Sequence, residues 1–406
     1  MVNIANMMRL SPVKLINLME KNKIEPIYLD NNATTPCDPK VVESMLPFFY
    51  QFYGNPNNGL HWQGRKSKNA IDESREKVAH LIGANENEIF FTSGATESIN
   101  LSVLGCAKAN ANHNRKKIIT SAIEHKAVLD SCNSLNNDGF EIVILDPSPS
   151  GIISIDTLKE FLDEKTLLVS IQAANNEVGT IQPIKELANL SHSFGAIFHC
   201  DATQAIGKIQ FDASELEVDL VSFSSHKIYG PKGVGALFIN GGKNALPLQP
   251  LFWGGGQEYG LRPGTSNTPG IVGFGEACRI CQSNQEHELE FIQSLRDSFE
   301  LALQSQLKSI LINGKASKRL PNTSNITFPG VDADALILNS PGIMIGTGSA
   351  CNTGAIEPSH VLISMGISRE LANSSVRVSF GRFNKIEDVI IASGELINAY
   401  QRLLSI

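Results

Sequence analysis

Short apolar runs alternate with longer amphipathic stretches along most of this chain. Strands are predicted where the apolar runs lie, at 89–91, 117–120, 141–145, 167–171, 197–200, 220–223 and 234–239. Helices are predicted where apolar residues recur every three or four positions, at 65–82, 97–107, 125–135 and 183–193. This alternation predicts an α/β fold in which helices cover both faces of a mostly parallel sheet.

The pattern changes after about residue 274. A long helix is predicted at 285–305, and it is followed by a strand at 325–328, a helix at 332–338, a strand at 376–380 and a closing helix at 387–404. This order predicts a smaller α+β domain packed on the first. The expected division is an N-terminal extension with a short helix at 1–26, a large domain at 27–274 whose first segment is free to pack with the small domain, and a small domain at 275–406.

The net charge limits the kinds of partner that the protein is expected to bind. The chain of 406 residues has a formal net charge of −7 at pH 7, which does not favour binding to nucleic acid or to an anionic membrane. Its apolar runs are too short to cross a membrane. The first 25 residues lack the apolar core and cleavage site of a secretory signal, so a cytoplasmic location is expected.

The seven cysteines do not form a disulfide framework, because their number is odd and they are scattered through a long chain. Cys278 and Cys281 have the CxxC spacing of redox and zinc motifs, but no second pair or nearby histidine pair completes a zinc site. The two thiols lie in a helical pattern. We therefore expect them to pack within a helix rather than to do redox or metal chemistry, and we expect no metal site.

A lysine follows the apolar run at 220–223. Ser224, Ser225 and His226 precede Lys227, and a Gly/Pro cluster at 229–233 forces a loop after it. A lysine delivered to the edge of a sheet, beside hydroxyl groups that can hold an anion, suits a Schiff base with pyridoxal phosphate (PLP). On this segment alone, a solvated lysine that closes a strand is the stronger interpretation.

A carboxylate follows the neighbouring apolar run. Asp201 comes directly after the strand predicted at 197–200, where it could pair with the ring nitrogen of PLP and keep that nitrogen protonated. The alternative is a helix N-cap, which is common for aspartate after a strand. The presence of Lys227 favours the cofactor role.

A third segment is typical of anion binding. Residues 92–98 follow the strand at 89–91 and combine hydroxyl side chains with a glycine turn before a helical pattern. Backbone amides at a helix start attract anions, and a capping box is the alternative. The segment is neither a Walker loop nor a dinucleotide fingerprint.

Together these segments resemble the cysteine desulfurases of the NifS/IscS type, within the class V aminotransferase group of fold-type I PLP enzymes. The resemblance covers about residues 27 to 395. It rests on nine ordered motifs, at 28–36, 92–98, 124–128, 175–179, 224–233, 254–258, 262–265, 348–351 and 375–377.

The resemblance implies a role for each of a set of residues. Lys227 would hold PLP and act as the base, His125 would stack over the ring, and Asp201 would pair with the ring nitrogen. Gln204 would bind the ring hydroxyl. The phosphate would be bound by Ala95, Thr96, Ser224 and His226, and by Thr265 from the partner subunit of a homodimer. The substrate carboxylate would be held by Asn176 and Arg377.

Cys351 decides the activity that the resemblance implies. It lies in a polar stretch, 346–354, with three glycines, which is a poor place for a buried structural cysteine and a suitable one for a moving nucleophile. The implied reaction converts L-cysteine to L-alanine and leaves a persulfide on Cys351. The family usually has Ser-Ser before Gly-Ser-Ala-Cys and Thr-Ser after it, whereas this chain has Gly346-Thr347 and Asn352-Thr353-Gly354.

The resemblance does not identify the sulfur acceptor. An iron–sulfur scaffold, a tRNA-thiolation relay and a DNA-modification system all remain open.

Two other activities would use much of the same site. A selenocysteine lyase would act on selenium with the same residues, and a class V aminotransferase would share Lys227, Asp201 and His125 but would have no use for Cys351.

Overall fold

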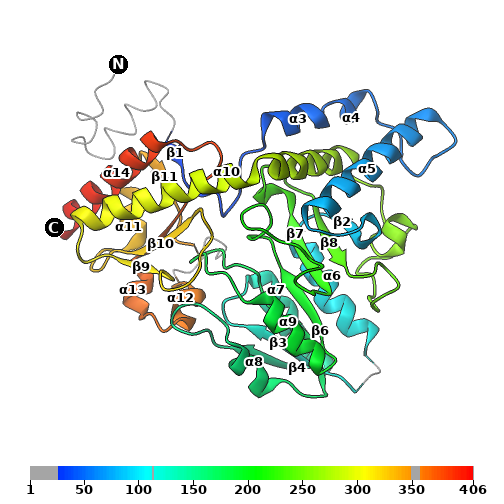
Figure 1. Ribbon diagram of the computed structural model, residues 1–406, viewed down its shortest axis with the longest axis horizontal. Helices are drawn as coiled ribbons and strands as arrows, with labels where there is room; N and C mark the ends of the chain where they lie inside the picture. The colour runs from blue at the N-terminus through cyan, green and yellow to red at the C-terminus, as the bar shows by residue number, and fades with distance from the viewer. Residues whose placement is uncertain (1–25, 112–113, 349–356, 406) are drawn as a thin grey trace.

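The computed structural model describes residues 26–111, 114–348 and 357–405 (Figure 1). The N-terminal helix predicted within residues 1–26 therefore lies outside the described residues, apart from residue 26. No helix of the described part is both long enough and apolar enough to span a membrane.

A seven-stranded mixed sheet forms the centre of the molecule. Its spatial order is β2 (Ile89–Thr92), β8 (Gly235–Ile239), β7 (Leu220–Ser224), β6 (Ile197–Asp201), β5 (Thr166–Ser170), β3 (Lys117–Ser121) and β4 (Glu141–Leu145). The five strands from β7 to β4 run parallel to one another, and β8 is antiparallel to both of its neighbours. The predicted fold class, a mostly parallel mixed sheet, is confirmed.

Alternate residues of the strands enter two different cores. In β2, Ile89 and Phe91 face one core and Phe90 faces the other, as the two-residue period of a strand requires. One face is covered by α5 (Trp62–Leu81), α8 (Ile155–Phe161), α9 (Ile184–Ser193) and the first part of α10 (Thr268–Gln306). The other face is covered by α6 (Ala95–Ala109) and α7 (Lys126–Ser134). Burial on both faces explains why the strands read as continuous apolar runs.

One helix connects this sheet to a second core. The 39 residues of α10 extend about 58 Å, and in Figure 1 the helix runs from beside α5 to beside α14 (Ile386–Leu404). Phe274 lies in the sheet core, whereas Leu295 and Phe299 lie in the second core. The domain boundary placed at residue 274 falls in the first turns of this unbroken helix, and it stays a prediction.

The second core is built on two small sheets. An antiparallel sheet has the order β12 (Ser375–Ser379), β10 (Thr323–Thr327) and β9 (Leu311–Asn313), and α11 (Ala333–Leu338) and α14 pack with it. Strand β1 (Ile27–Tyr28) pairs in parallel with β11 (Ile343–Met344). The first described residues therefore lie beside strands that come late in the chain, which places residues 30–36 between the two cores.

Short elements complete the described chain. The α-helices are α3 (Pro39–Met45), α4 (Pro47–Tyr50), α12 (His360–Ser364) and α13 (Arg369–Asn373). The 3₁₀ helices are η1 (Glu86–Glu88), η2 (Leu135–Asp138), η3 (Ser225–Lys227) and η4 (Gln257–Gly260). Of these, η3 matters most for function, because it carries a predicted site lysine.

The predicted elements agree with the structure within three residues, with one exception. The helix predicted at 285–305 is the second part of α10, which begins at Thr268 because Asn267 caps it; Pro269 lies in the first turn, where proline is tolerated. Cys278 and Cys281 both lie buried in α10, which confirms the prediction that they pack within a helix.

Candidate active site

A cavity of about 900 Å³ opens where the parallel strands end. Ten of the twelve residues predicted for the site line it: Ala95, Thr96, His125, Asn176, Asp201, Gln204, Ser224, His226, Lys227 and Arg377. Their side chains come from segments spread over most of the described chain. This edge of a parallel sheet is where ligands bind in open α/β folds.

Lys227 reaches this cavity from η3, the turn that follows β7. Its side chain is half-buried, and Nζ donates hydrogen bonds to the main-chain oxygens of Asn32 (2.6 Å) and Ala33 (2.7 Å). Two carbonyl oxygens thus fix the position of the amine. This arrangement is inconsistent with the alternative of a solvated lysine that only closes a strand.

Asp201 is the last residue of β6 and is buried. Its Oδ1 accepts a hydrogen bond from the main-chain N–H of Thr203 at 3.0 Å. Residues 202–219 form turns rather than a helix, so the helix N-cap alternative is wrong. The carboxylate lines the cavity and can therefore pair with a group bound there.

His125 is the N-cap of α7, and its Nδ1 accepts from the N–H of Ala127 at 3.1 Å. A neutral imidazole with Nδ1 as acceptor carries its hydrogen on Nε2. Burial lowers the pKa of His125; Asp201 opposes this effect, and Lys227 acts in the same direction as burial. The ring is therefore held as a neutral imidazole with an N–H group directed away from the helix.

The start of α6 and the end of β7 face each other across one end of the cavity. Gly94, with φ 155°, is the N-cap of α6, and a Cβ added to it would lie 3.8 Å from Ser224 Oγ. Gly94 has no side chain to bond the first turn, so the reciprocal capping box is absent and the amides around Ala95 and Thr96 remain to bind an anion.

His226 contributes a hydrogen-bonding group rather than a charge to this end. Its Nδ1 and Thr34 Oγ1 are 3.0 Å apart. Burial, reinforced by Lys227, lowers the pKa of His226 to about 4. At neutral pH the imidazole is uncharged, and Thr34 fixes the orientation of its ring.

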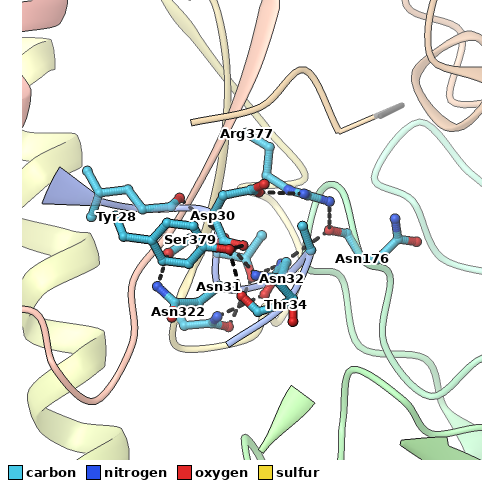
Figure 2. A network of polar contacts seen from close by, with 12 residues as sticks. Tyr28, Asp30, Asn31, Asn32, Thr34, Asn176, Asn322, Arg377 and Ser379 are labelled. Carbon is cyan, nitrogen blue, oxygen red and sulfur yellow. Dashed lines mark hydrogen bonds and ion pairs between the residues drawn. The ribbon is translucent and has the colours of Figure 1, made fainter. Parts of the chain in front are cut away.

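Arg377 and Asn176, which also line the cavity, meet in a network of polar contacts (Figure 2). Arg377 lies on β12 with its side chain only 3% exposed; Nη2 pairs with Asp30 Oδ1 at 2.7 Å and Nη1 donates to Asn176 O at 3.1 Å. Its Nε is buried and has no hydrogen-bond partner among the described residues. The guanidinium is therefore held firmly and still has a donor to offer a carboxylate.

Sequence reasoning missed the residue that links these groups. The main-chain oxygen of Asn32 accepts from Lys227 and from Gln204 Nε2 (2.9 Å). Its Nδ2 donates to Asn176 O (3.1 Å) and Thr323 Oγ1 (2.8 Å). The available signal was its place in the motif at 28–36, one of the nine that carried the family resemblance.

Glu177 was missed as well. This carboxyl group lines the cavity, is buried, and accepts a short hydrogen bond from Ser359 Oγ. Burial raises the pKa of Glu177, against the opposing effect of that hydrogen bond. Its signal was its place in the motif at 175–179.

One predicted residue does not line the cavity, and another lies outside the described residues. Thr265 is exposed in the loop before α10. Cys351 lies outside the described residues. The cavity is nevertheless lined by Gly348 and Glu357, the residues on either side of 349–356.

The cavity suits PLP in its donor set. It offers an amine, a buried carboxylate, a neutral imidazole and a helix start, and these are the groups that a phosphorylated pyridine aldehyde would need. Thr203 Oγ1 also lines it, and this buried hydroxyl has no partner among the described residues. A ligand with several acceptors would satisfy such orphaned groups.

Comparison with known proteins agrees with this geometry. The model of the aminotransferase class-V family matches residues 27–391. The chain belongs to the class V aminotransferase family. It is 43% identical over 374 residues to "Cysteine desulfurase IscS" of Rickettsia bellii (strain OSU 85-389), which covers 92% of this chain and 91% of the relative. The resemblance stated from the sequence is confirmed.

Two solved structures superpose on nearly the whole of this chain. A "NifS-like protein" superposes with a TM-score of 0.86 at 38% identity, over 94% of this chain and all of that one. The structure described as "SspA in complex with cysteine" superposes with a TM-score of 0.78 at 37% identity, over 88% of this chain and all of that one.

Proposed function

We propose that this class V aminotransferase family member acts as a cysteine desulfurase, which converts L-cysteine to L-alanine and retains the sulfur as a persulfide on Cys351. The observation that carries the proposal is the single cavity in which Lys227, His125, Asp201 and Arg377 meet. Relatives named as cysteine desulfurases span nearly the whole chain and agree with it.

Each end of the cavity would hold a different part of the ligands. The amides of Ala95 and Thr96, with Ser224 and neutral His226, would bind the phosphate of PLP. Asp201 would pair with the ring nitrogen, Gln204 would donate to the ring hydroxyl, and His125 would lie over the ring. When bound, PLP supplies an electron sink that stabilises negative charge at the substrate Cα.

The protein's own groups would handle the substrate. Arg377, with Asn176, would bind the carboxylate of L-cysteine, because Nη1 and Nη2 each keep a second hydrogen beyond their contacts with Asn176 and Asp30. Lys227 Nζ would remove the proton from Cα and later return a proton to the product. His125 lines the same cavity, and its Nε2–H would donate to the substrate.

The sulfur step needs a thiolate. The thiolate of Cys351 would attack the sulfur of the substrate, forming an S–S bond as the C–S bond breaks, and the electron pair of the C–S bond would remain with carbon. A proton then replaces sulfur on that carbon. Cysteine and one enzyme thiol thus give alanine and one enzyme persulfide, without an external oxidant or reductant.

We also propose two partners. The first is a second copy of the chain, whose Thr265 would reach this subunit's phosphate site. The second is a sulfur-acceptor protein, in iron–sulfur cluster assembly, tRNA thiolation or DNA modification. A cytoplasmic location stays a prediction.

The first test separates desulfurase from aminotransferase. Wild-type protein with L-cysteine and a reductant is expected to release alanine and sulfide in equal amounts. Cys351→Ser is expected to retain PLP and cysteine binding but to lose at least about 100-fold in sulfide release, since a hydroxyl is a far weaker nucleophile towards sulfur than a thiolate. Mass spectrometry of the Cys351 peptide checks for the added sulfur atom.

Other outcomes would identify a different activity. Transfer of the amino group between an amino acid and a keto acid, with cysteine ignored, would indicate an aminotransferase. Activity on selenocysteine alone would indicate a selenocysteine lyase. Unchanged sulfide release by Cys351→Ser would show that the nucleophile is another residue.

A further inference from the structure

A second lysine lies behind the site, and neither the predicted set nor the mechanism above uses it. Lys208 follows Gln204 in the turn after β6, is 8% exposed, and lines a small cavity that Lys227 also lines. Its Nζ donates to Gln204 Oε1 in a short hydrogen bond, and to Asn32 Oδ1 at 3.2 Å.

The surroundings of Lys208 are unusual for a lysine. None of the ion pairs among the described residues includes it, and both of its acceptors are uncharged amide oxygens. The charged groups that act on it are cations, Lys227 and Arg377; Glu288 lines the same small cavity but is paired with Arg382. Burial, with these two cations, lowers the pKa of Lys208 well below its ordinary value. Burying an amine without an ion-pair partner costs stability, so Lys208 is expected to have a role other than ion pairing.

The contact with Gln204 indicates this role, because it determines which way the Gln204 side-chain amide is turned. A side-chain amide can be turned by 180°, which exchanges its oxygen and its nitrogen. Here Lys208 donates to the oxygen, and the main-chain oxygen of Asn32 accepts one hydrogen of the nitrogen at 2.9 Å. The nitrogen carries a second hydrogen, which remains for a group bound in the large cavity that Gln204 lines.

We propose that Lys208 is a positioning residue that orients the Gln204 amide, so that an N–H donor rather than an oxygen faces the ligand cavity. This inference rests on the proposed function, in which Gln204 donates to the ring hydroxyl of PLP. Without Lys208, Gln204 Oε1 is a buried acceptor with no donor, and the amide loses its reason to keep this orientation.

The test uses Lys208→Met in the full-length protein and two measurements that are not activity. The first is the dissociation constant of PLP, which is expected to rise about fivefold. The second is the pH midpoint of the visible absorption of bound PLP, expected to rise by about one pH unit. An N–H donor stabilises negative charge on the ring oxygen; when it is lost, that charge holds the neighbouring proton more tightly.

A double-mutant cycle shows whether Lys208 acts through Gln204. Gln204→Met alone is expected to shift the midpoint as Lys208→Met does, and the double variant is expected to shift it no further. The matched control is Lys117→Met, which removes a lysine of similar exposure from the start of β3, away from the cavity. This control is expected to leave both measurements unchanged.

Two results would overturn the proposal, and they differ in what else they overturn. If wild-type protein takes up PLP and Lys208→Met shows the wild-type affinity and midpoint, only the role of Lys208 is wrong. The same holds if the effect of Lys208→Met persists in full in the Gln204→Met background, because Lys208 then acts as a charge or by packing. If wild-type protein takes up no PLP, the proposed function fails, and this inference fails with it.

Discussion

The residues around Lys227 show how much of a catalytic site consists of groups that only hold other groups. Asn32 uses its main-chain oxygen for Lys227 and Gln204, and both ends of its side chain for further partners. A buried polar side chain with all its hydrogen bonds made has one conformation. The amine and the ligand-facing amide are therefore placed before any ligand arrives, which reduces the reorganisation that binding requires.

His125 is both the N-cap of α7 and the proposed donor to the substrate, and a substitution can separate these two roles. His125→Asn is expected to fold normally, because asparagine is as good an N-cap as the present imidazole acceptor is for α7. The same change is expected to lower the rate of alanine formation about 100-fold, because the amide cannot exchange a proton near neutral pH. The measurements are alanine release and thermal unfolding. His125→Ala is the comparison: it should lose the same activity and about 1 kcal/mol of stability as well. Near wild-type turnover in His125→Asn would remove the imidazole from the mechanism.

At the scale of elements, the sequence predicted the ends of single strands and helices well, but not the contacts between segments far apart in the chain. Strand ends were predicted well because apolar runs stop where a chain leaves the core, so Asp201 and Lys227 could be placed at the edge of a sheet. The start of α6 was predicted within two residues, because the glycine turn before it is visible in the sequence. The contact of Asp30 with Arg377 was not visible, because it joins β12 to a segment 347 residues away and depends on the pairing of β1 with β11.

The long helix α10 carries a second prediction. Burial raises the pKa of the Cys281 thiol to about 12 and that of Cys278 well above its ordinary range. Neither thiol is then a thiolate at neutral pH, so neither should react with iodoacetamide in the folded protein. Peptide mass spectrometry after brief alkylation at pH 7.5 is expected to find Cys351 labelled and these two unlabelled. Full labelling of all three after denaturation is the control. Loss of sulfur transfer in Cys278→Ala, with folding and PLP content intact, would instead indicate a redox role for the CxxC pair.

At the scale of the whole molecule, the site lies between two cores. Asp201 ends β6 of the central sheet and Lys227 lies in η3, directly after β7, whereas Arg377 comes from the small antiparallel sheet packed with α14. Asn32, in the segment that follows β1, contacts both parts: its main-chain oxygen accepts from Lys227, and its Nδ2 donates to Thr323 of β10. We propose that the boundary between two domains follows this division, with residues near 27 belonging to the small domain in space and α10 running through both.

The exposed aromatic residues around η4 lead to the last prediction. Trp253 is 80% exposed, with Phe252 and Tyr259 also exposed close by, and Glu258 of the same segment is paired with Arg75 of α5. Apolar exposure of this kind favours a protein–protein contact, and tryptophan and tyrosine often dominate such contacts. Thr265, predicted to reach the partner's phosphate site, lies in the loop that follows. A homodimer through this face would give each cavity its missing phosphate ligand.

Trp253→Asp is therefore expected to convert a dimer to a monomer in sedimentation experiments and to lower PLP retention on dialysis about tenfold, since a buried charge at an interface is costly. Leu338→Asp on α11 is the control: this leucine is similarly open to solvent, at 73% exposed, but lies on a helix of the second core, and its variant should remain a PLP-loaded dimer. Thr265→Ala should separate the two effects, because it removes a phosphate contact and leaves the aromatic face intact. It is expected to remain dimeric and to lose PLP faster than wild type. A wild-type monomer that holds PLP firmly would show that each subunit completes its own site and that the exposed aromatic residues serve another partner.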